Sequence, residues 1–144
     1  MLLESDVINA VCKKLEFQDY FIQQKLQPNQ QGDDIIAVKA GLHPRKLIIE
    51  AKGETSSRIG SERYGKPFDS AQVRVHVAEA FYKSAQVLSR GTYEGEKILS
   101  GIALPDTNLH RNYVKYIQPV LDNLQIIVFW VDETKNVQIT SPIP

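Results

Sequence analysis

Hydrophobic residues recur at helical spacing in three stretches of the chain and at strand-like spacing in six others. The first helical stretch is 2–16. The second runs from about 70 to 90, and Gly91 directly after it is a typical signal for the end of a helix. The third is 109–124, in which Pro119 predicts a kink or a restart of the helix.

The strand-like stretches are short apolar runs bounded by turn residues. They cover 19–27, 34–40, 45–52, 97–104, 125–132 and 137–141. The turn GLHP joins the second run to the third as a hairpin. The predicted order of elements is therefore α-β-β-β-α-β-α-β-β, in which helices and strands interleave. That order is typical of an α/β fold with a mixed sheet and helices on both faces.

Composition narrows the class of protein only in part. The 144 residues, with 42% hydrophobic and 24% charged, predict one globular domain covering 1–144. Lys plus Arg equals Asp plus Glu at 17 each, so net charge argues neither for nor against nucleic acid. Cys12 is the single cysteine, which excludes an internal disulfide, and its apolar neighbours place it in the core. No signal peptide and no membrane-spanning run is recognisable, so we expect a cytoplasmic protein without a membrane partner.

Charged residues gather at the open end of the predicted hairpin. Side chains alternate along a strand, so Ile48, Glu50 and Lys52 share one face, while Ile49 and Ala51 share the other. A carboxylate and an ammonium group on an otherwise apolar strand are costly to bury unless they are paired or hold a metal ion. The end of this strand is therefore the first candidate for a functional site.

The neighbouring strand brings a further carboxylate, but the pattern leaves open which one. If 34 and 50 lie opposite each other, Asp34 joins Glu50 and Lys52 on the same face. If the turn is one residue longer or shorter, Asp33 takes that place. The run 35–38 is apolar on both faces, so it does not fix the register.

The motif D-(x15)-E-A-K on a hairpin, after an N-terminal helix bearing a glutamate, resembles the PD-(D/E)XK nucleases. The resemblance in element order covers about 4–131. It implies a restriction-endonuclease-like fold, a three-layer sandwich with the order αβββαβαβ(β). It assigns the family's aspartate to Asp34 and its E-x-K to Glu50, Ala51 and Lys52. The proline of the family's motif is absent, because Asp33 precedes Asp34.

The same resemblance suggests further site residues on two helices. Glu4 is the candidate for the early glutamate of the family, ahead of Glu16. Gln72 matches a glutamine that RecB-like members carry on the helix after E-x-K. Those members have a tyrosine one turn later, where this chain has His76. A proline–aspartate pair does occur at Pro105 and Asp106, but no E-x-K follows it, so we set it aside.

The chemistry of phosphodiester hydrolysis explains why these residue types would be needed. Attack on an anionic phosphorus requires neutralised charge and an activated water. Two carboxylates, Asp34 and Glu50, can hold Mg²⁺ or Mn²⁺, which prefer oxygen ligands. The resemblance adds the backbone carbonyl of Ala51 as a ligand. Glu4 would bind a second ion or accept a hydrogen bond from metal-bound water. The resemblance also implies that Lys52 orients the attacking water or stabilises developing negative charge.

The stretch 53–69 has no periodicity and is rich in glycine, serine and charge, which favours a functional loop. Hydroxyls and cations here, and on the helix that follows, can bind phosphates, and Tyr64 and Phe68 can stack on bases. The candidates for substrate binding are Ser56, Ser57, Arg58, Arg63, Lys66, Arg74 and His76. The alternative is an ordinary solvated loop, with His76 as a structural residue of its helix.

These features together predict a Mg²⁺-dependent endonuclease that hydrolyses DNA. One alternative is a catalytically inactive nuclease-like domain that serves in nucleic-acid binding or assembly. The other is an unrelated α/β protein in which Asp34, Glu50 and Lys52 form a structural ion pair. A chain of 144 residues has little room for a separate recognition domain, so we also expect a homodimer or a partner subunit.

Overall fold

The computed structural model describes residues 1–27, 30–55, 65–93, 95–140 and 143. In these ranges the helices are α1 (Glu4–Phe17), α2 (Ser70–Ser89), α3 (Asn108–Lys115) and α4 (Gln118–Asn123). The strands in the same ranges are β1 (Phe21–Lys25), β2 (Ile35–Lys39), β3 (Arg45–Ala51), β4 (Thr92–Tyr93), β5 (Glu96–Pro105), β6 (Ile127–Val131) and β7 (Val137–Ile139).

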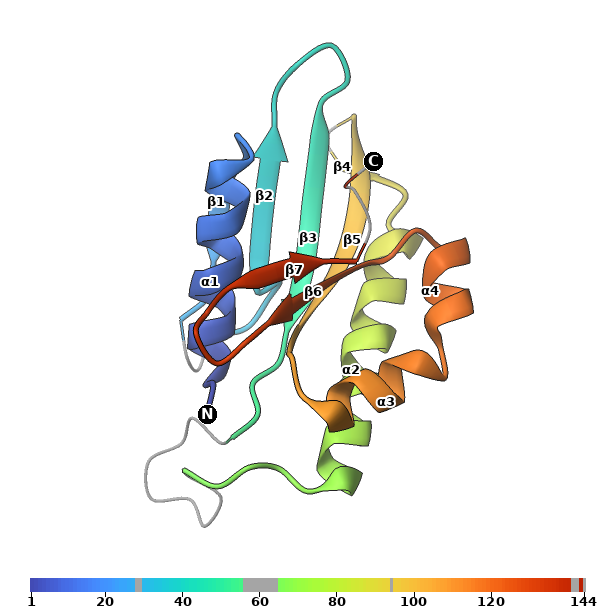
Figure 1. Ribbon diagram of the computed structural model, residues 1–144. Coiled ribbons are helices and arrows are strands. Elements are labelled where there is room, and N and C mark those ends of the chain that lie inside the picture. Colours follow the sequence, from blue (N-terminus) through green and yellow to red (C-terminus); the bar gives the residue numbers. More distant parts are fainter. Residues whose placement is uncertain (28–29, 56–64, 94, 141–142, 144) are drawn as a thin grey trace.

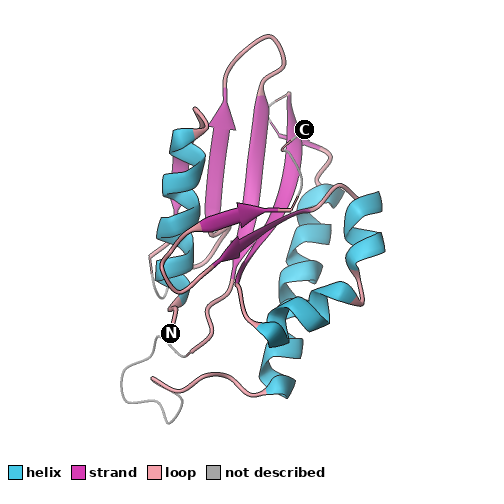
Figure 2. Ribbon diagram, viewed as in Figure 1, coloured by secondary structure: helices cyan, strands magenta, loops and turns pink. Residues whose placement is uncertain are grey.

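The strands form one mixed, strongly twisted sheet between two layers of helices (Figure 1). Its order is β1-β2-β3-β5-β6-β7, and β4 pairs with β5 at the side of this path. Strands β1, β2 and β3 form an antiparallel meander, whereas β3, β5 and β6 run parallel to one another. Helix α1 covers one face, and α2, α3 and α4 lie on the other (Figure 2). The predicted class, a three-layer sandwich, is confirmed.

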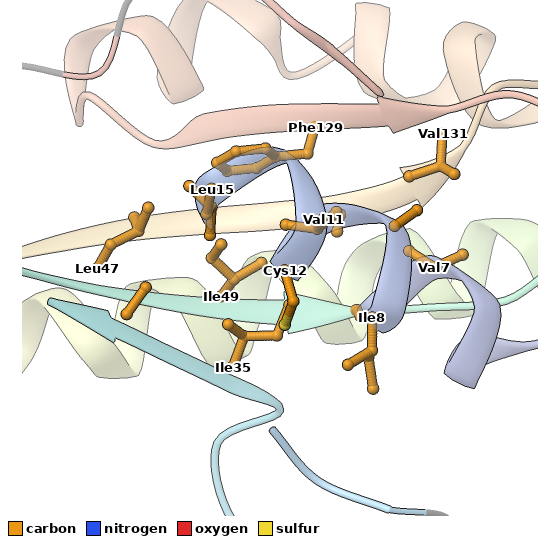
Figure 3. Close-up of a cluster of buried hydrophobic side chains, with 14 of the residues drawn as sticks. Val7, Ile8, Val11, Cys12, Leu15, Ile35, Leu47, Ile49, Phe129 and Val131 are labelled. Atoms are coloured by element: carbon orange, nitrogen blue, oxygen red, sulfur yellow. The ribbon is translucent and has the colours of Figure 1, made fainter. Parts of the chain in front are cut away.

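Helix α1 is amphipathic and packs its apolar stripe on the first face of the sheet. Val7, Val11 and Leu15 are fully buried there, against side chains such as Ile49 of β3 and others of β6 (Figure 3). Cys12 lies in the same cluster, as the sequence predicts. Each fully buried aliphatic side chain contributes roughly 1.5–3 kcal/mol. The helix is thereby fixed with its N-terminus at the end of the sheet where β3 finishes.

Helix α2 lies across the opposite face, and capping residues in the sequence define where it begins and ends. Asp69 caps its N-terminus, since its carboxylate accepts a hydrogen bond from the backbone N–H of Gln72 at 2.9 Å. Gly91 follows its C-terminus with a φ of 76°, a conformation in which glycine is favoured. Both boundaries match the predicted helix at about 70–90.

The restart of the helix predicted at Pro119 is confirmed. The stretch 109–124 is two helices, α3 and α4, because Pro119 cannot continue a helix and instead occupies the first turn of α4. The two-residue strand β4 was not predicted, because it is too short to leave a period in the sequence. In the part of the chain that the structure describes, no helix is both long and apolar enough to cross a bilayer.

Candidate active site

The register of the β2–β3 hairpin decides which aspartate joins the site. Ile35 pairs with Ile49, so the next pair outward is Asp34 with Glu50. The Asp34 carboxylate accepts a hydrogen bond from the backbone N–H of Ala51 at 2.8 Å. Asp33 instead forms a two-pronged ion pair with Arg90, with distances of 2.9 and 3.0 Å. The alternative that the sequence leaves open is thereby resolved in favour of Asp34.

The predicted alternation along β3 is also present. Ile49 and Ala51 belong to the core beneath α1, whereas Ile48 packs with Val87 of α2 on the other face. Lys52 contacts Glu79, which is likewise on α2. Glu50 lies between Ile48 and Lys52 on the same face of β3, so its carboxyl group is also on the side of the sheet that α2 covers.

Asp34 and Glu50 form a buried carboxyl pair. Asp34 is 8% exposed, the Glu50 side chain is 13% exposed, and the two carboxyl groups lie side by side in the register of the hairpin. Burial raises the pKa of Glu50, and the charge of Asp34 raises it further. Burial also raises the pKa of Asp34, although the N–H of Ala51 and nearby lysines oppose the shift. Two neighbouring acids whose pKa values are both raised are typical of a functional site.

Lys52 lies between carboxylates from two elements. Its Nζ is 3.1 Å from Glu79 Oε2 and 3.7 Å from Glu50 Oε1. Burial acts to lower the pKa of Lys52, but the hydrogen bond to Glu79 and the negative charges of Glu50, Glu79 and Glu4 outweigh it and raise the pKa. Lys52 therefore stays a cation, and its contact with Glu79 of α2 keeps its ammonium group beside the carboxyl pair.

Glu4 reaches the site because the start of α1 packs directly against Gly53. A Cβ atom on Gly53 would lie 2.5 Å from the backbone nitrogen of Glu4 and 2.9 Å from the carbonyl carbon of Leu3. Two hydrogen bonds stabilise the same contact. The backbone N–H of Leu2 donates to Glu54 Oε1 at 2.7 Å, and the backbone N–H of Glu54 donates to the carbonyl of Leu2 at 2.9 Å. Burial and the charge of Asp34 raise the pKa of Glu4 to about 7, against the opposing effect of Lys52.

The donor atoms at this place are suited to a hard cation. The N–H of Ala51 points toward Asp34, and in a strand the carbonyl of the same residue points the same way. Two carboxylates and one carbonyl can bind Mg²⁺, which keeps several waters and takes substrate oxygens as well. Among the described residues, no group of three or more His, Cys, Asp and Glu side chains is gathered closely enough to hold a metal ion. The charge of Asp34 thus raises the pKa of Glu4, but Glu4 does not form a three-carboxylate cluster with Asp34 and Glu50.

Other predicted site residues lie in different environments. The side-chain oxygen of Gln72 accepts from the backbone N–H of Asp69 at 2.9 Å, so this side chain completes the cap of α2. His76 is half-buried and packs edge-on against Phe68 with 4.5 Å between the ring centres. Burial lowers the pKa of His76, as does the charge of Lys52, while Glu79 opposes them.

The predicted substrate-binding loop is described only in part. Lys66 and Arg74 are exposed to solvent, as phosphate-binding residues need to be. The predictions for Ser56, Ser57, Arg58 and Arg63, and for Tyr64 as a stacking residue, lie outside the described residues. A bridge between Thr55 and Pro67 and a hydrogen bond of 2.9 Å from Phe68 to Glu54 bring the two ends of the loop together beside the site.

Sequence reasoning gave no role to Glu79, Lys83 and Gly53. The signal for the first two was a polar stripe at helical spacing along α2, but only the structure shows which way this stripe faces. The stripe consists of Gln72, His76, Glu79 and Lys83. The signal for Gly53 was a glycine directly after E-A-K. Asp106, set aside above, forms a two-pronged ion pair with Arg111 at 2.7 and 3.0 Å, which fits a structural role.

The order of elements, the mixed sheet between helical layers and the charged end of the hairpin define the class of fold as restriction-endonuclease-like. A crystal structure of an XisH family protein from Nostoc punctiforme is similar to this chain, with a TM-score of 0.51 and 14% sequence identity. The match covers 94% of this chain and 99% of that protein. No family model and no curated protein sequence matches the chain. At this identity the likeness supports the fold alone.

Proposed function

We propose that this protein is a metal-dependent endonuclease of the PD-(D/E)XK superfamily that hydrolyses DNA phosphodiester bonds. The observation that carries the proposal is the carboxyl pair of Asp34 and Glu50, with Lys52 at its mouth, at the open end of a buried hairpin. All three belong to the D-(x15)-E-A-K pattern by which this chain resembles that superfamily.

Asp34, Glu50 and the carbonyl of Ala51 would hold Mg²⁺ or Mn²⁺. Such an ion supplies positive charge for the phosphate and makes a nearby water more acidic. Lys52 orients that water and stabilises developing negative charge, because Glu79 keeps it protonated and in place. Glu4 has a pKa of about 7, so near neutral pH it can accept or donate a proton at the edge of the site.

The energetics of the site favour a functional reading over a structural ion pair. A structural pair joins opposite charges and stabilises the fold, whereas here two acids are forced together and their pKa values rise. Raised carboxyl pKa values cost stability at neutral pH, a cost that a cation relieves. A catalytically inactive nuclease-like domain that binds nucleic acid is the second candidate, since binding alone needs the same surface.

DNA is the substrate that we propose, because the exposed cations Lys66 and Arg74 lie on the segment that leaves the site and on the helix that follows. Arg58 and Arg63 belong to the same stretch of sequence. A homodimer or a partner subunit would supply the rest of the DNA-binding surface.

The decisive experiment combines cleavage with metal binding. We expect the wild-type protein to nick or linearise supercoiled plasmid with Mg²⁺ and to lose this activity with chelator. Asp34→Asn and Glu50→Gln should weaken Mn²⁺ binding in calorimetry and abolish cleavage, while circular dichroism shows an intact fold. Asp33→Asn is the matched control, because the Asp33 carboxylate pairs with Arg90 and not with the site, and this variant should retain both properties.

Each pattern of results selects one reading. Lys52→Ala should bind the ion and leave DNA uncut. Metal and DNA binding without cleavage in the wild type would indicate the inactive nuclease-like domain. Unchanged Mn²⁺ affinity in both carboxyl variants would remove Asp34 and Glu50 as ligands and leave a structural role.

A further inference from the structure

Helix α2 runs antiparallel to β3, and two contacts fix the alignment of these elements. Ile48 packs with Val87 at one end, and Lys52 contacts Glu79 at the other. From Ile48 to Lys52 the strand rises roughly 13 Å, and from Glu79 to Val87 the helix rises about 12 Å. The two spans agree, so the middle of one segment faces the middle of the other. Glu50 is the middle of the strand segment, and Lys83 is the middle of the helix segment.

Lys83 lies on the flank of α2 that borders the site. The buried stripe of the helix passes through Ala80 and Ser84, so Glu79 and Lys83 stand next to it on the same side. Lys83 lowers the pKa of both Asp34 and Glu50 through its charge, as expected for a cation close to the pair.

Lys83 has no ion-pair partner among the described residues, although one stands in a suitable position. Glu79 precedes it by four residues, the spacing and order in which a glutamate and a lysine pair on a helix. The Glu79 carboxylate is instead 3.1 Å from Lys52. Glu79 of the helix therefore pairs with Lys52. Lys83 remains as a second, solvent-exposed cation beside the carboxyl groups of Asp34 and Glu50.

We propose that Lys83 binds a phosphate oxygen of the nucleic-acid strand that lies across the Asp34–Glu50 pair. The inference rests on the proposed function and adds α2 to the substrate-binding surface. A phosphate that approaches two carboxylates needs more than one cation to offset the repulsion. Lys52 is engaged by Glu79, whereas Lys83 is exposed and carries three donors on a flexible stem.

A purely structural role for Lys83 makes a different prediction. In that case Lys83 only offsets the negative charge of the carboxyl pair, and its loss would destabilise the folded protein without changing how affinity depends on salt. A phosphate contact, in contrast, contributes one released counterion to the salt dependence of binding.

The test measures binding of a short DNA duplex with Ca²⁺ in place of Mg²⁺, across a salt series, and cleavage with Mg²⁺. Lys83→Ala should lower affinity about tenfold, the loss of one charge-assisted hydrogen bond, and reduce the salt slope by roughly one unit. Lys83→Arg should restore most of the affinity. The control is Lys97→Ala, which should behave as wild type. Lys97 is an exposed lysine at the start of β5, and it pairs with Arg45 at the start of β3, whereas the site lies where β3 ends.

The outcomes separate this inference from the proposed function. If the wild type cleaves DNA and Lys83→Ala matches it in kcat, KM and salt slope, the role of Lys83 is wrong and the nuclease proposal stands. If the wild type binds without cleaving and the salt slope still falls in Lys83→Ala, the phosphate contact holds and the catalytic proposal fails. If the wild type neither binds nor cleaves DNA, both are overturned.

Discussion

Replacement of Glu4 by glutamine should stabilise the metal-free protein at neutral pH but not in mild acid. Burial and the charge of Asp34 raise the pKa of Glu4 from 4.5 to about 7 in the folded chain. Between these values the folded state binds more protons than the unfolded state, so stability falls as pH rises through this window. Glutamine has nearly the same shape and never ionises, so the variant escapes this loss.

The expected size follows from the shift in pKa. At ~1.4 kcal/mol per unit, the rise from 4.5 to about 7 corresponds to roughly 3 kcal/mol. The side chain is only partly buried, so solvent screens some of this, and we expect about 1–2 kcal/mol. For a chain of this length the gain in Tm would be about 3–6 °C at about pH 8.

The assay is urea denaturation in the presence of chelator, followed by the fluorescence of the single tryptophan, Trp130, from about pH 4.5 to 8.5. The two proteins should converge at the acid end and separate progressively above it. Glu16→Gln is the control, since Glu16 is exposed on the same helix and its replacement removes no buried carboxyl group. A constant difference across the series, or a variant that is less stable near pH 8, would refute the placement of Glu4 beside the carboxyl pair.

Three further predictions concern the surroundings of the site. Gly53→Ala should lower the free energy of unfolding by roughly 2 kcal/mol and reduce cleavage, because its Cβ would lie 2.5 Å from the backbone of Glu4; an unchanged Tm would contradict the packing. DNA affinity should need Ca²⁺ and fall with salt, since the chain has no net charge to attract a polyanion; equal affinity with chelator, flat with salt, would exclude nucleic acid as the substrate. Asp106→Ala should retain cleavage and lose at most about 1 kcal/mol in thermal denaturation, because its pair with Arg111 is partly exposed; loss of cleavage would show that Asp106 is no bystander.

Period-two alternation was enough to place Glu50 and Lys52 on one face of β3, because Ile49 and Ala51 on the other face are plainly apolar. The register of β2 was beyond the sequence, since 35–38 is apolar on both faces. What distinguishes Asp34 from Asp33 is a pair of long-range contacts. Asp34 accepts from Ala51, and Asp33 binds Arg90, which is 57 residues away.

The polar stripe of α2 could be read from the sequence, but the role of each residue in it could not. Gln72, the candidate taken from the resemblance, lies in the first turn, where its amide oxygen caps the helix. Glu79, two turns later, is the residue that reaches Lys52. Helical periodicity states which residues share a flank, whereas the position of the helix along the strand depends on packing such as that of Val87 on Ile48.

The contacts that assemble the site differ greatly in how far they reach along the chain. Asp34 and Ala51 are 17 residues apart, and Lys52 and Glu79 are 27 apart, whereas Leu2 and Glu54 are separated by 52. The hairpin and α2 therefore form a contiguous module that contains the acids and both lysines, and its short-range contacts are favoured early in folding. Helix α1 supplies Glu4 through the longer-range contact of Leu2 with Glu54 and closes one side of the site. A protein engineer who transplants the site must therefore carry β5 along with the β2–β3–α2 block, because β5 pairs with β3 and its Ile102 and Leu104 share a core cluster with α2.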